Sequence, residues 1–458
     1  MKDLLYTLLF VFLITSCTED EGVKFQPDSF YINTESTVVN EADGTIELTF
    51  NTSKIYTSDL IINYTLTGTA ENTIDYTLLP IASVTIPTGE LSTVLTINLI
   101  NDSLIEEQED IILTVTDTSN PELFIDASDA ITISIIDDEG IAFQNGILIP
   151  NFGNAASGTI SFISNNFTTT QQQIYNSVNS ENVGNGLMSI GFNNDKAYLI
   201  TTDDNKITVV NRYSFLKETT INTGLNNPRH FVVSGDKGYV TNWGDPTITT
   251  DDFIAVIDLA TNTVETTIPV EEGPERVITL NGKLYVSHKG GLNYNNIISV
   301  IDTTDNTVAT LIGIGDVPDE MIFDASNNIW VVCEGKPAAS GSETGGKLIK
   351  INTSDDEVVT SIDFASTEHP KNLSYETGKL YYDLAGGIYS MLETDITLPT
   401  TPIITTPTFA MSVKNGNLYT TNAVDMISNG TLKVFDLTDN SEIQSITVGV
   451  IPRDIYFN

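Results

Sequence analysis

One stretch of twenty residues, numbers 226–245, collects side chains that are scarce elsewhere in the chain. It reads NNPRHFVVSGDKGYVTNWGD and contains Arg229, His230 and Trp243, although the 458 residues include only four arginines, 3 His and 2 Trp. A guanidinium and an imidazole supply hydrogen-bonding groups in a fixed geometry, and an indole supplies apolar area. Two short apolar runs around a Gly-containing turn predict a strand–turn–strand unit. This combination favours the binding of a large amphipathic ligand at the ends of strands.

The strand–turn–strand pattern recurs from about residue 146 onward. Each copy has an anchor residue in a short strand, and successive anchors are 38 to 51 residues apart. The anchors are Leu148, Tyr198, Tyr239, Tyr285, Trp330, Tyr381 and Tyr419. Four short strands per copy indicate a β-propeller, and the seven copies predict seven blades over residues 140–458. The final residues, IPRDIYFN, match the opening strand of a copy, so we expect them to close the ring against residues 147–150.

Propeller geometry predicts where the scarce side chains meet. The turn before the first strand of each blade and the turn between its second and third strands lie on one face, around the mouth of the central channel. The predicted ligand-binding residues on that face are Phe152, Arg229, His230, Asn242, Trp243, Asp245, Arg276, His288, Lys289, Glu334, Lys336, Lys371 and Arg453. The alternative is structural, with the arginines bridging to acidic residues of adjacent blades such as Glu275 or Asp454.

No catalytic motif accompanies these residues. The sequence contains no H-E-x-x-H, no C-x-x-C and no Walker-type loop, and GLMSIG lacks the G-x-S-x-G spacing of a nucleophile elbow. We therefore expect a binding protein without catalytic residues. The enzymatic alternative is a propeller hydrolase or lactonase, with a rim metal held by histidine and aspartate.

Composition narrows the class of partner. The chain has 61 acidic against 20 basic residues, a formal net charge of -41. Such a chain is repelled by nucleic acid and by anionic membrane surfaces, so neither is expected as a partner. Hydrophobic residues make up 40% of the chain and fall in alternating runs, which predicts a folded all-β protein. The strand spacing changes near residue 140, which predicts a domain boundary there.

Residues 1–17 have the pattern of an export signal. Lys2 precedes a largely apolar run of 11 residues, Leu4 to Ile14, which is shorter than the roughly 20 residues that span a bilayer. The run ends in LITSC, which resembles the bacterial lipobox and implies a lipid on Cys17. Residues 18–24 contain TEDEG, similar to the acidic export tag of Bacteroidetes surface lipoproteins. The resemblance implies a surface-exposed protein held to the outer membrane by its lipid alone, and the alternative is a signal peptide without lipidation.

Cysteine usage limits covalent cross-linking. With Cys17 lipidated, Cys333 is the only other cysteine in the sequence. An intramolecular disulfide is then impossible, and the fold depends on packing alone.

Residues 25–139 have the alternating pattern of a β-sandwich of about seven strands. The segments that carry a family resemblance are VVNEADGTIELTF, INYTLTGTAENTIDY, VTIPTGELSTVLTINLINDSLIEEQEDIILTV and ITISIIDDE. They resemble the Calx-β family, an immunoglobulin-like sandwich that binds calcium at one end. The implied ligands are Glu41, Asp75, Asp102, Glu106, Asp137, Asp138 and Glu139, with the Leu104 carbonyl. Calcium prefers oxygen ligands, so converging carboxylates suit it. Asn101 and Ser103 replace aspartates usual in that family, which weakens the second metal position.

The propeller half carries a second resemblance. Its segments are NFGNAASGTISF, LNNPRHFVVSGDKGYVTNWGD, FIAVIDLATNTVETTIPVEEGPERV, GKLYVSHKGG and NNIWVVCEGK. They resemble the YncE-like, YVTN-repeat proteins and, more closely, Bacteroidetes surface lipoproteins of the DUF5074 type. That group includes proteins that capture cobalamin and pass it to a TonB-dependent outer-membrane transporter. The resemblance implies a surface protein that captures a small molecule, with cobalamin as ligand and such a transporter as partner. The alternatives are an adhesion propeller that binds protein or glycan, and a propeller hydrolase.

Overall fold

The computed structural model describes residues 30–78, 82–102, 106, 108–121, 123, 130–137, 142–154 and 157–458. The chain folds as two compact units, Met1–Gly140 and Ile141–Asn458. The predicted lipidation residue Cys17 and the segments 1–17 and 18–24 lie outside the described residues, as do Leu104, Asp138 and Glu139. Among the residues that are described, no helix has the length and apolar character needed to cross a membrane.

The first unit contains two facing sheets. One sheet has the order β1 (Phe30–Asn33), β3 (Thr45–Thr52), β7 (Ser92–Leu99) and β5 (Tyr76–Thr77). The other has the order β2 (Val38–Asn40), β9 (Ala130–Ile136), β8 (Glu109–Thr118), β4 (Leu60–Gly68) and β6 (Ser83–Ile86). β2 pairs with β9 in parallel, and the other pairs are antiparallel. A short 3-10 turn, η1 (Glu41–Asp43), follows β2.

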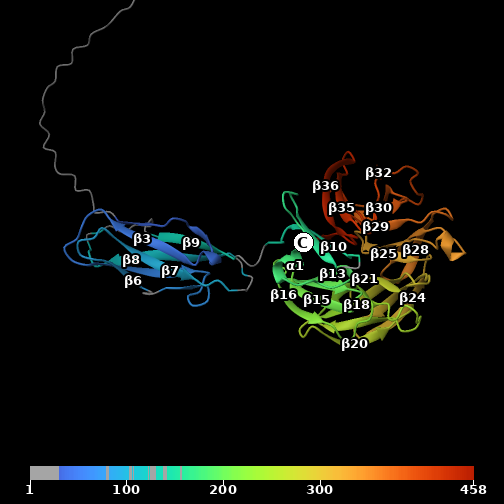
Figure 1. The fold of residues 1–458 in the computed structure, drawn as a ribbon, viewed down its shortest axis with the longest axis horizontal. Coiled ribbons are helices and arrows are strands. Elements are labelled where there is room, and N and C mark those ends of the chain that lie inside the picture. Colours follow the sequence, from blue (N-terminus) through green and yellow to red (C-terminus); the bar gives the residue numbers. More distant parts are fainter. Residues whose placement is uncertain are drawn as a thin grey trace, which may run out of the picture. The chain divides into compact units, whose positions relative to one another are not determined.

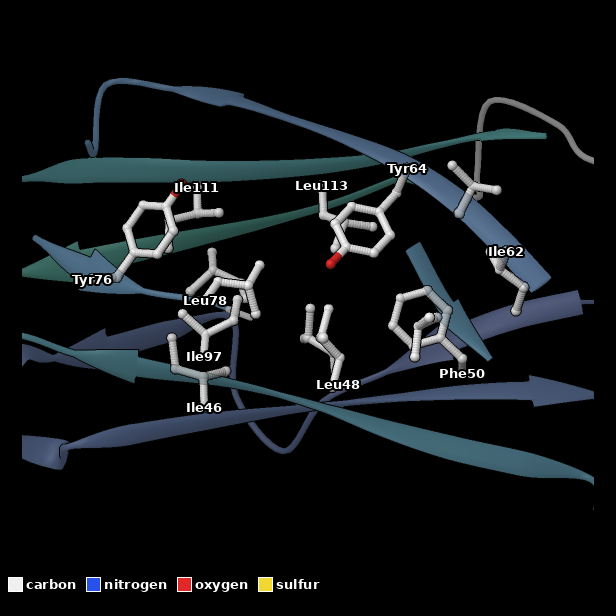
Figure 2. Close-up of a cluster of buried hydrophobic side chains, with 14 of the residues drawn as sticks. Ile46, Leu48, Phe50, Ile62, Tyr64, Tyr76, Leu78, Ile97, Ile111 and Leu113 are labelled. Carbon is white, nitrogen blue, oxygen red and sulfur yellow. The ribbon is translucent and has the colours of Figure 1, made fainter. Parts of the chain in front are cut away.

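Alternation along the strands builds the core of this unit. In β3, Ile46, Leu48 and Phe50 are buried while the residues between them are more exposed. The same period in β4 and β8 turns their apolar side chains toward those of β3, and Figure 2 shows both sets in the layer between the sheets. This arrangement is a β-sandwich, because each sheet buries one face against the other.

In the described part of the second unit, the strands form seven four-stranded antiparallel sheets. The first three sheets are β12 (Thr170–Gln171), β11 (Thr159–Ser164), β10 (Gly146–Asn151) and β37 (Tyr456–Phe457); β13 (Leu187–Asn193), β14 (Lys196–Thr201), β15 (Lys206–Asn211) and β16 (Lys217–Ile221); and β17 (Pro228–Ser234), β18 (Lys237–Asn242), β19 (Phe253–Asp258) and β20 (Thr263–Pro269).

The other four sheets follow in sequence order. They are β21 (Pro274–Leu280), β22 (Lys283–His288), β23 (Ile297–Asp302) and β24 (Thr307–Gly313); β25 (Pro318–Phe323), β26 (Ile329–Cys333), β27 (Lys347–Asn352) and β28 (Glu357–Asp363); β29 (Lys371–Glu376), β30 (Lys379–Leu384), β31 (Gly387–Leu392) and β32 (Ile404–Thr405); and β33 (Met411–Lys414), β34 (Asn417–Asn422), β35 (Asn429–Asp436) and β36 (Ser441–Val450). The helical segments are α1 (Ile174–Asn179) and η2 (Ala338–Ser340).

These sheets are arranged as a β-propeller. The first strands of successive sheets contact one another, from β13 through β17, β21, β25 and β29 to β33. Figure 1 shows β13, β21, β25 and β29 toward the centre, and the last strands β16, β20, β24, β28 and β36 at the periphery. The second strands are almost wholly buried, as expected for strands that are covered on both faces.

The predicted ring closure is confirmed. β37 pairs with β10 through Ile147–Phe457 and Leu148–Tyr456, so the last strand of the chain becomes the innermost strand of the first sheet. Asn458 adds side-chain hydrogen bonds to the carbonyls of Phe143 and Arg212. The sheet therefore joins two ends of the unit that are far apart in sequence.

The tyrosine anchors link neighbouring sheets. Tyr239 on β18 is buried, and its hydroxyl lies 3.2 Å from Oδ1 of Asn306, in the turn before β24 of the next sheet. Tyr285 on β22 repeats this arrangement one sheet later, with its hydroxyl 2.7 Å from Oδ1 of Asp356. Asn306 and Asp356 both have positive φ, 58° and 59°, which Asn and Asp adopt more readily than most residues. The repeat thus conserves an anchor and a turn residue that bond to each other across sheets.

Candidate ligand-binding site

Proline turns place the charged residues at the starts of the innermost strands. In β17, β21 and β25 the strand begins with a proline, Pro228, Pro274 or Pro318, a position where the missing N–H is tolerated. The pairing register with the second strand then shifts across the next two residues. This extra residue is a β-bulge, which interrupts the alternation of side chains. Consequently, both residues after each of these prolines face the same cavity.

The cavity lies where the innermost strands meet and has a volume of about 310 Å³. Its lining is Met188, Arg229, His230, Trp243, Glu275, Arg276, Lys289, Asp319, Glu320, Glu334, Lys371, Asn372, Thr408, Phe409 and Arg453. Five of the chain's 20 lysines and arginines are in this lining, including three of the four arginines. In a chain of net charge -41, so many basic side chains at one site form a local exception to the overall charge.

Arg229 is held by a carboxylate and an indole. Its Nε and Nη2 donate to the two carboxylate oxygens of Glu275 at 3.1 and 2.9 Å, which is a bidentate pair. Its guanidinium carbon lies 3.9 Å from the centre of the Trp243 ring. Burial raises the pKa of Glu275, but the charges of Arg229 and His230 hold it well below its ordinary value. Arg229 and Glu275 therefore form a buried ion pair between β17 and β21.

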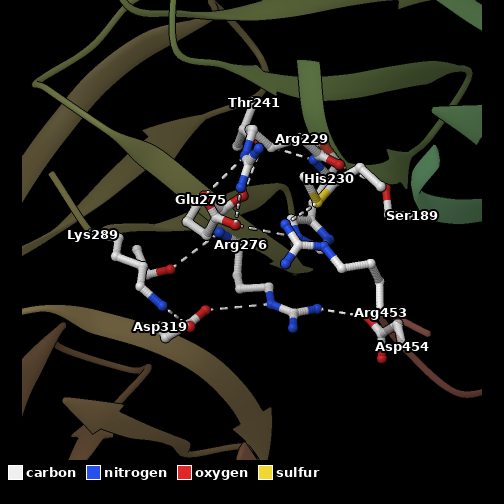
Figure 3. A network of polar contacts seen from close by, with 12 residues as sticks. Ser189, Arg229, His230, Thr241, Glu275, Arg276, Lys289, Asp319, Arg453 and Asp454 are labelled. Carbon is white, nitrogen blue, oxygen red and sulfur yellow. Dashed lines mark hydrogen bonds and ion pairs between the residues drawn. The ribbon is translucent and has the colours of Figure 1, made fainter. Parts of the chain in front are cut away.

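Arg276 contacts three carboxylates. Its Nη1 lies 2.7 Å from Asp454, its Nη2 lies 2.9 Å from Glu320, and its Nε lies 3.5 Å from Asp319. Burial, together with Asp319 and Asp454, raises the pKa of Glu320 to about 7, although Arg276 lowers it. Lys289 extends the network, because its Nζ lies 2.5 Å from Asp319. Figure 3 shows this cluster of ion pairs.

Arg453 differs from the other two arginines. Among the described residues, no carboxylate oxygen lies within 4.0 Å of its guanidinium; the contact of that group is a 3.3 Å approach of Nη2 to the sulfur of Met188. The guanidinium carbon lies 5.0 Å from the Phe152 ring centre and 5.8 Å from that of Phe409. Burial and the positive charge of Arg229 lower the pKa of Arg453 to about 10. The cavity thus contains one guanidinium in a largely aromatic setting.

Most of the predicted site residues meet in this cavity. Its lining includes Arg229, His230, Trp243, Arg276, Lys289, Glu334, Lys371 and Arg453, and Phe152 packs against Arg453. Thr408 and Phe409 also line it but were not predicted. They follow Pro407, so the residues after each proline are the signal that could have identified them.

Four predicted residues do not line the cavity. Asn242 is fully buried, and its amide donates to the Val240 carbonyl at 2.9 Å. His288 is also fully buried, with Nε2 2.8 Å from Ser299 Oγ, and burial lowers its pKa to about 4. Lys336 pairs with an aspartate at 3.2 Å, and Asp245 accepts hydrogen bonds within its own turn. These side chains differ from the prediction because the last residue of a second strand turns inward, whereas the turn beyond it leads away from the axis.

A cluster of carboxylates occupies the sandwich. Side-chain oxygens of Asp75, Glu106 and Glu109 all lie within 4.8 Å of one another. Burial raises the pKa of Glu106, and the charges of Asp75, Asp102 and Asp137 raise it further. Burial, a hydrogen bond with Asp75 and nearby charges raise the pKa of Glu109 to about 7. Converging carboxylates that repel one another are the donor set that a calcium ion prefers.

The sequence prediction of this cluster was incomplete. It named Asp75, Asp102, Glu106 and Asp137, which influence one another here, but it omitted Glu109 at the start of β8. Glu41 is buried in η1. The signal for Glu109 was its place in EEQED, three residues after Glu106 in the same acidic run.

Comparisons with known proteins support the fold of the second unit. A selenium-binding protein from Sulfolobus tokodaii, described as hypothetical, has a TM-score of 0.52 at 9% identity, over 69% of this chain and 94% of that chain. Apo AztD from Citrobacter koseri has a TM-score of 0.42 at 11% identity, over 68% and 96%. The apo Calx CBD1 domain has a TM-score of 0.21 at 20% identity, over 24% and 97%. At these identities, the first likeness is one of fold alone.

Sequence families give the closer assignment. No curated protein matches the chain. Residues 145–432, more than half of the chain, match the family described as "Domain of unknown function (DUF5074)". The match spans most of the propeller, including the strands that carry Arg229, Arg276 and Lys371. The chain therefore belongs to the DUF5074 family.

Proposed function

We propose that this protein is a cell-surface lipoprotein that captures a small molecule in the central cavity of a seven-bladed propeller. The observation that carries the proposal is the cavity of about 310 Å³ with Arg229, Arg276, Lys289, Lys371 and Arg453 in its lining. Binding pockets typically measure about 300–1,000 Å³ and combine apolar surface with a few placed polar groups. Trp243, Phe409 and Met188 supply the apolar surface of this lining.

Structural bridging explains part of the cluster but not all of it. The pairs of Arg229 with Glu275, and of Arg276 with Glu320 and Asp454, connect strands of different sheets. Bridging of that kind needs no open volume. The bulges also argue for a site, because such irregularities are frequent beside functional sites, where they redirect side chains.

Cobalamin is the first ligand to test, because the propeller segments resemble those of surface proteins that capture it. A corrinoid is larger than a cavity of about 310 Å³, so it would lie across the mouth with one polar group inside. In this proposal the lipid on Cys17 holds the protein on the outer membrane, the sandwich is a Calx-β domain that binds calcium, and a TonB-dependent transporter receives the ligand.

Equilibrium dialysis against cyanocobalamin, read by visible absorbance, tests the ligand. We expect the wild-type protein to retain the colour, and Trp243→Ala to retain less because the indole supports Arg229 and contributes apolar area. Lys433→Ala is the matched control, because its ion pair with Glu442 lies on the last two strands of its sheet, away from the cavity lining. A colourless wild-type protein at ligand concentrations above its own would reject cobalamin.

Calcium binding by the sandwich has a separate test. Both tryptophans, Trp243 and Trp330, belong to the propeller, so tryptophan fluorescence follows the melting of that unit, whereas calorimetry follows both units. Added Ca²⁺ should raise a calorimetric transition while leaving the tryptophan transition unchanged, because a ligand stabilises the unit that binds it. Glu109→Gln should weaken the effect, and Glu90→Gln, an exposed glutamate of the same unit, should not. Identical calorimetric curves with Ca²⁺ and with chelator would rule out the site.

A further inference from the structure

We propose that Arg453 is the anion-binding residue of the central cavity, and that the captured molecule is an organic anion with a carboxylate or phosphate group and an apolar body. This inference rests on the proposed function of the cavity and specifies its ligand class. Arg229 and Arg276 act as positioning residues in this proposal, because their donors are already engaged.

The three arginines are separated by their partners. Arg229 uses Nε and Nη2 on both oxygens of Glu275, and Arg276 directs all three of its nitrogens to carboxylates. An anion approaching either group would have to displace a carboxylate that is already bonded. Arg453 requires no such displacement, because no carboxylate lies within 4.0 Å of it among the described residues.

Arg453 has a suitable carboxylate next to it in sequence but does not use it. The Asp454 side chain instead lies 2.7 Å from Nη1 of Arg276. The backbone N–H of Arg453 donates to the Pro150 carbonyl at 2.9 Å, as part of the ring closure, and this bond fixes where the side chain begins. The guanidinium then lies in the cavity with Met188, Phe152 and Phe409 around it.

The electrostatics of this position favour an incoming anion. Burial and the like charge of Arg229 both disfavour the charged form of Arg453, and its pKa falls to about 10, which still leaves it protonated at neutral pH. A buried charge without a partner is unfavourable. A carboxylate or phosphate on the ligand would remove that cost and accept two parallel hydrogen bonds from the guanidinium.

A second cation and an aromatic ring define the rest of the ligand. Lys371 lines the same cavity, and no carboxylate oxygen lies within 4.0 Å of its Nζ in the part of the chain that is described. Phe409 lies on the other side of the arginine from its own backbone and offers a ring to an apolar group. The two free cations and the aromatic surface together suit one anionic group attached to an apolar body.

The test uses the full chain and three probes with the same ring: phenyl phosphate, benzoate and neutral benzyl alcohol. Isothermal titration calorimetry should detect phenyl phosphate or benzoate, and the stronger of the two identifies the anion. Arg453→Gln should weaken that anion at least tenfold, Arg453→Lys should weaken it less, and Lys347→Gln, a propeller variant outside the cavity lining, should bind it normally. Benzyl alcohol should bind no better than the weaker anion in any variant.

A melting measurement excludes a merely structural role. Arg453 has no ion pair, and its charge is repelled by Arg229, so Arg453→Gln should melt at the wild-type temperature or above it. A lower melting temperature, or unchanged anion affinity in Arg453→Gln, would overturn the inference. Retention of cobalamin by wild type and Arg453→Gln alike would also overturn it while leaving the proposed function standing. Binding of phenyl phosphate through Arg453 without cobalamin retention would support the inference and reject cobalamin alone.

Discussion

Replacing Glu275 by glutamine should destabilise the propeller strongly. The substitution keeps the shape of the side chain but removes the negative charge that Arg229 contacts through two hydrogen bonds. Both side chains are only 9% exposed, so water cannot replace the lost partner. Removing one partner of a buried ion pair costs about 3–5 kcal/mol, because the other charge stays buried without compensation.

The expected change in melting temperature follows from the size of the unit. The propeller spans Ile141–Asn458, which is 318 residues, and unfolding entropy is about 2.1 cal/mol/K per residue, or roughly 0.67 kcal/mol/K for this unit. A loss of about 3–5 kcal/mol then lowers the melting temperature by about 4 to 8 °C. Tryptophan fluorescence is the assay, because both tryptophans report on this unit.

Two further variants make the result specific. The double variant Arg229→Gln with Glu275→Gln removes both charges and should recover part of the loss, since no unpaired charge remains at this pair. Glu442→Gln makes the same substitution in a pair that is 34% and 39% exposed, and should shift the melting temperature by about 1.5 °C at most. A shift in Glu275→Gln no larger than that of Glu442→Gln would refute the reasoning, as would a double variant less stable than both single variants together.

Two other outcomes are expected. Tyr285→Phe keeps the buried ring but removes the hydroxyl bonded to Asp356, so it should cost about 1 kcal/mol in urea unfolding followed by tryptophan fluorescence; no loss would mean that the inter-sheet bond contributes nothing. Glu320 has a pKa raised to about 7, so it is largely neutral at pH 6 and charged at pH 8, and the added negative charge should lower the affinity for phenyl phosphate severalfold over that range. Calorimetry of Glu320→Gln should show a flat profile over the same range, and a wild-type affinity that rises with pH would contradict this assignment.

The repeat was readable from sequence because each copy satisfies the same local demands. The anchor of a second strand is buried on both faces, which requires an apolar or aromatic residue there, as at Tyr198, Tyr239 and Tyr285. The final strand was predictable for the same reason, since a strand without a sheet behind it needs a partner, and the chain places it against β10. Patterns of this kind depend on neighbours in sequence and on the period of the fold, both of which a single sequence contains.

The details of the site were less predictable because they depend on distances between sheets. The sequence suggested that Arg229, Arg276 and Arg453 share one face, and they line one cavity. It could not indicate which of them is paired, since Glu275 precedes Arg276 in sequence yet pairs with Arg229. The bulge after each proline was also not foreseen, and for the last full sheet this led the sequence reading to Met411 rather than to Phe409.

The composition of the chain makes the lack of a partner at Arg453 informative. With 61 acidic residues for 20 basic ones, a basic side chain placed without selection would usually lie near a carboxylate. Arg229, Arg276 and Lys289 follow that expectation, and each has a carboxylate within 3 Å. Arg453 lies in the same cavity as those carboxylates and still meets a thioether and two aromatic rings instead. A scarcity of acids cannot explain this, so the position itself keeps one cation available, and a ligand with a negative group is the simplest reason for a fold to do so.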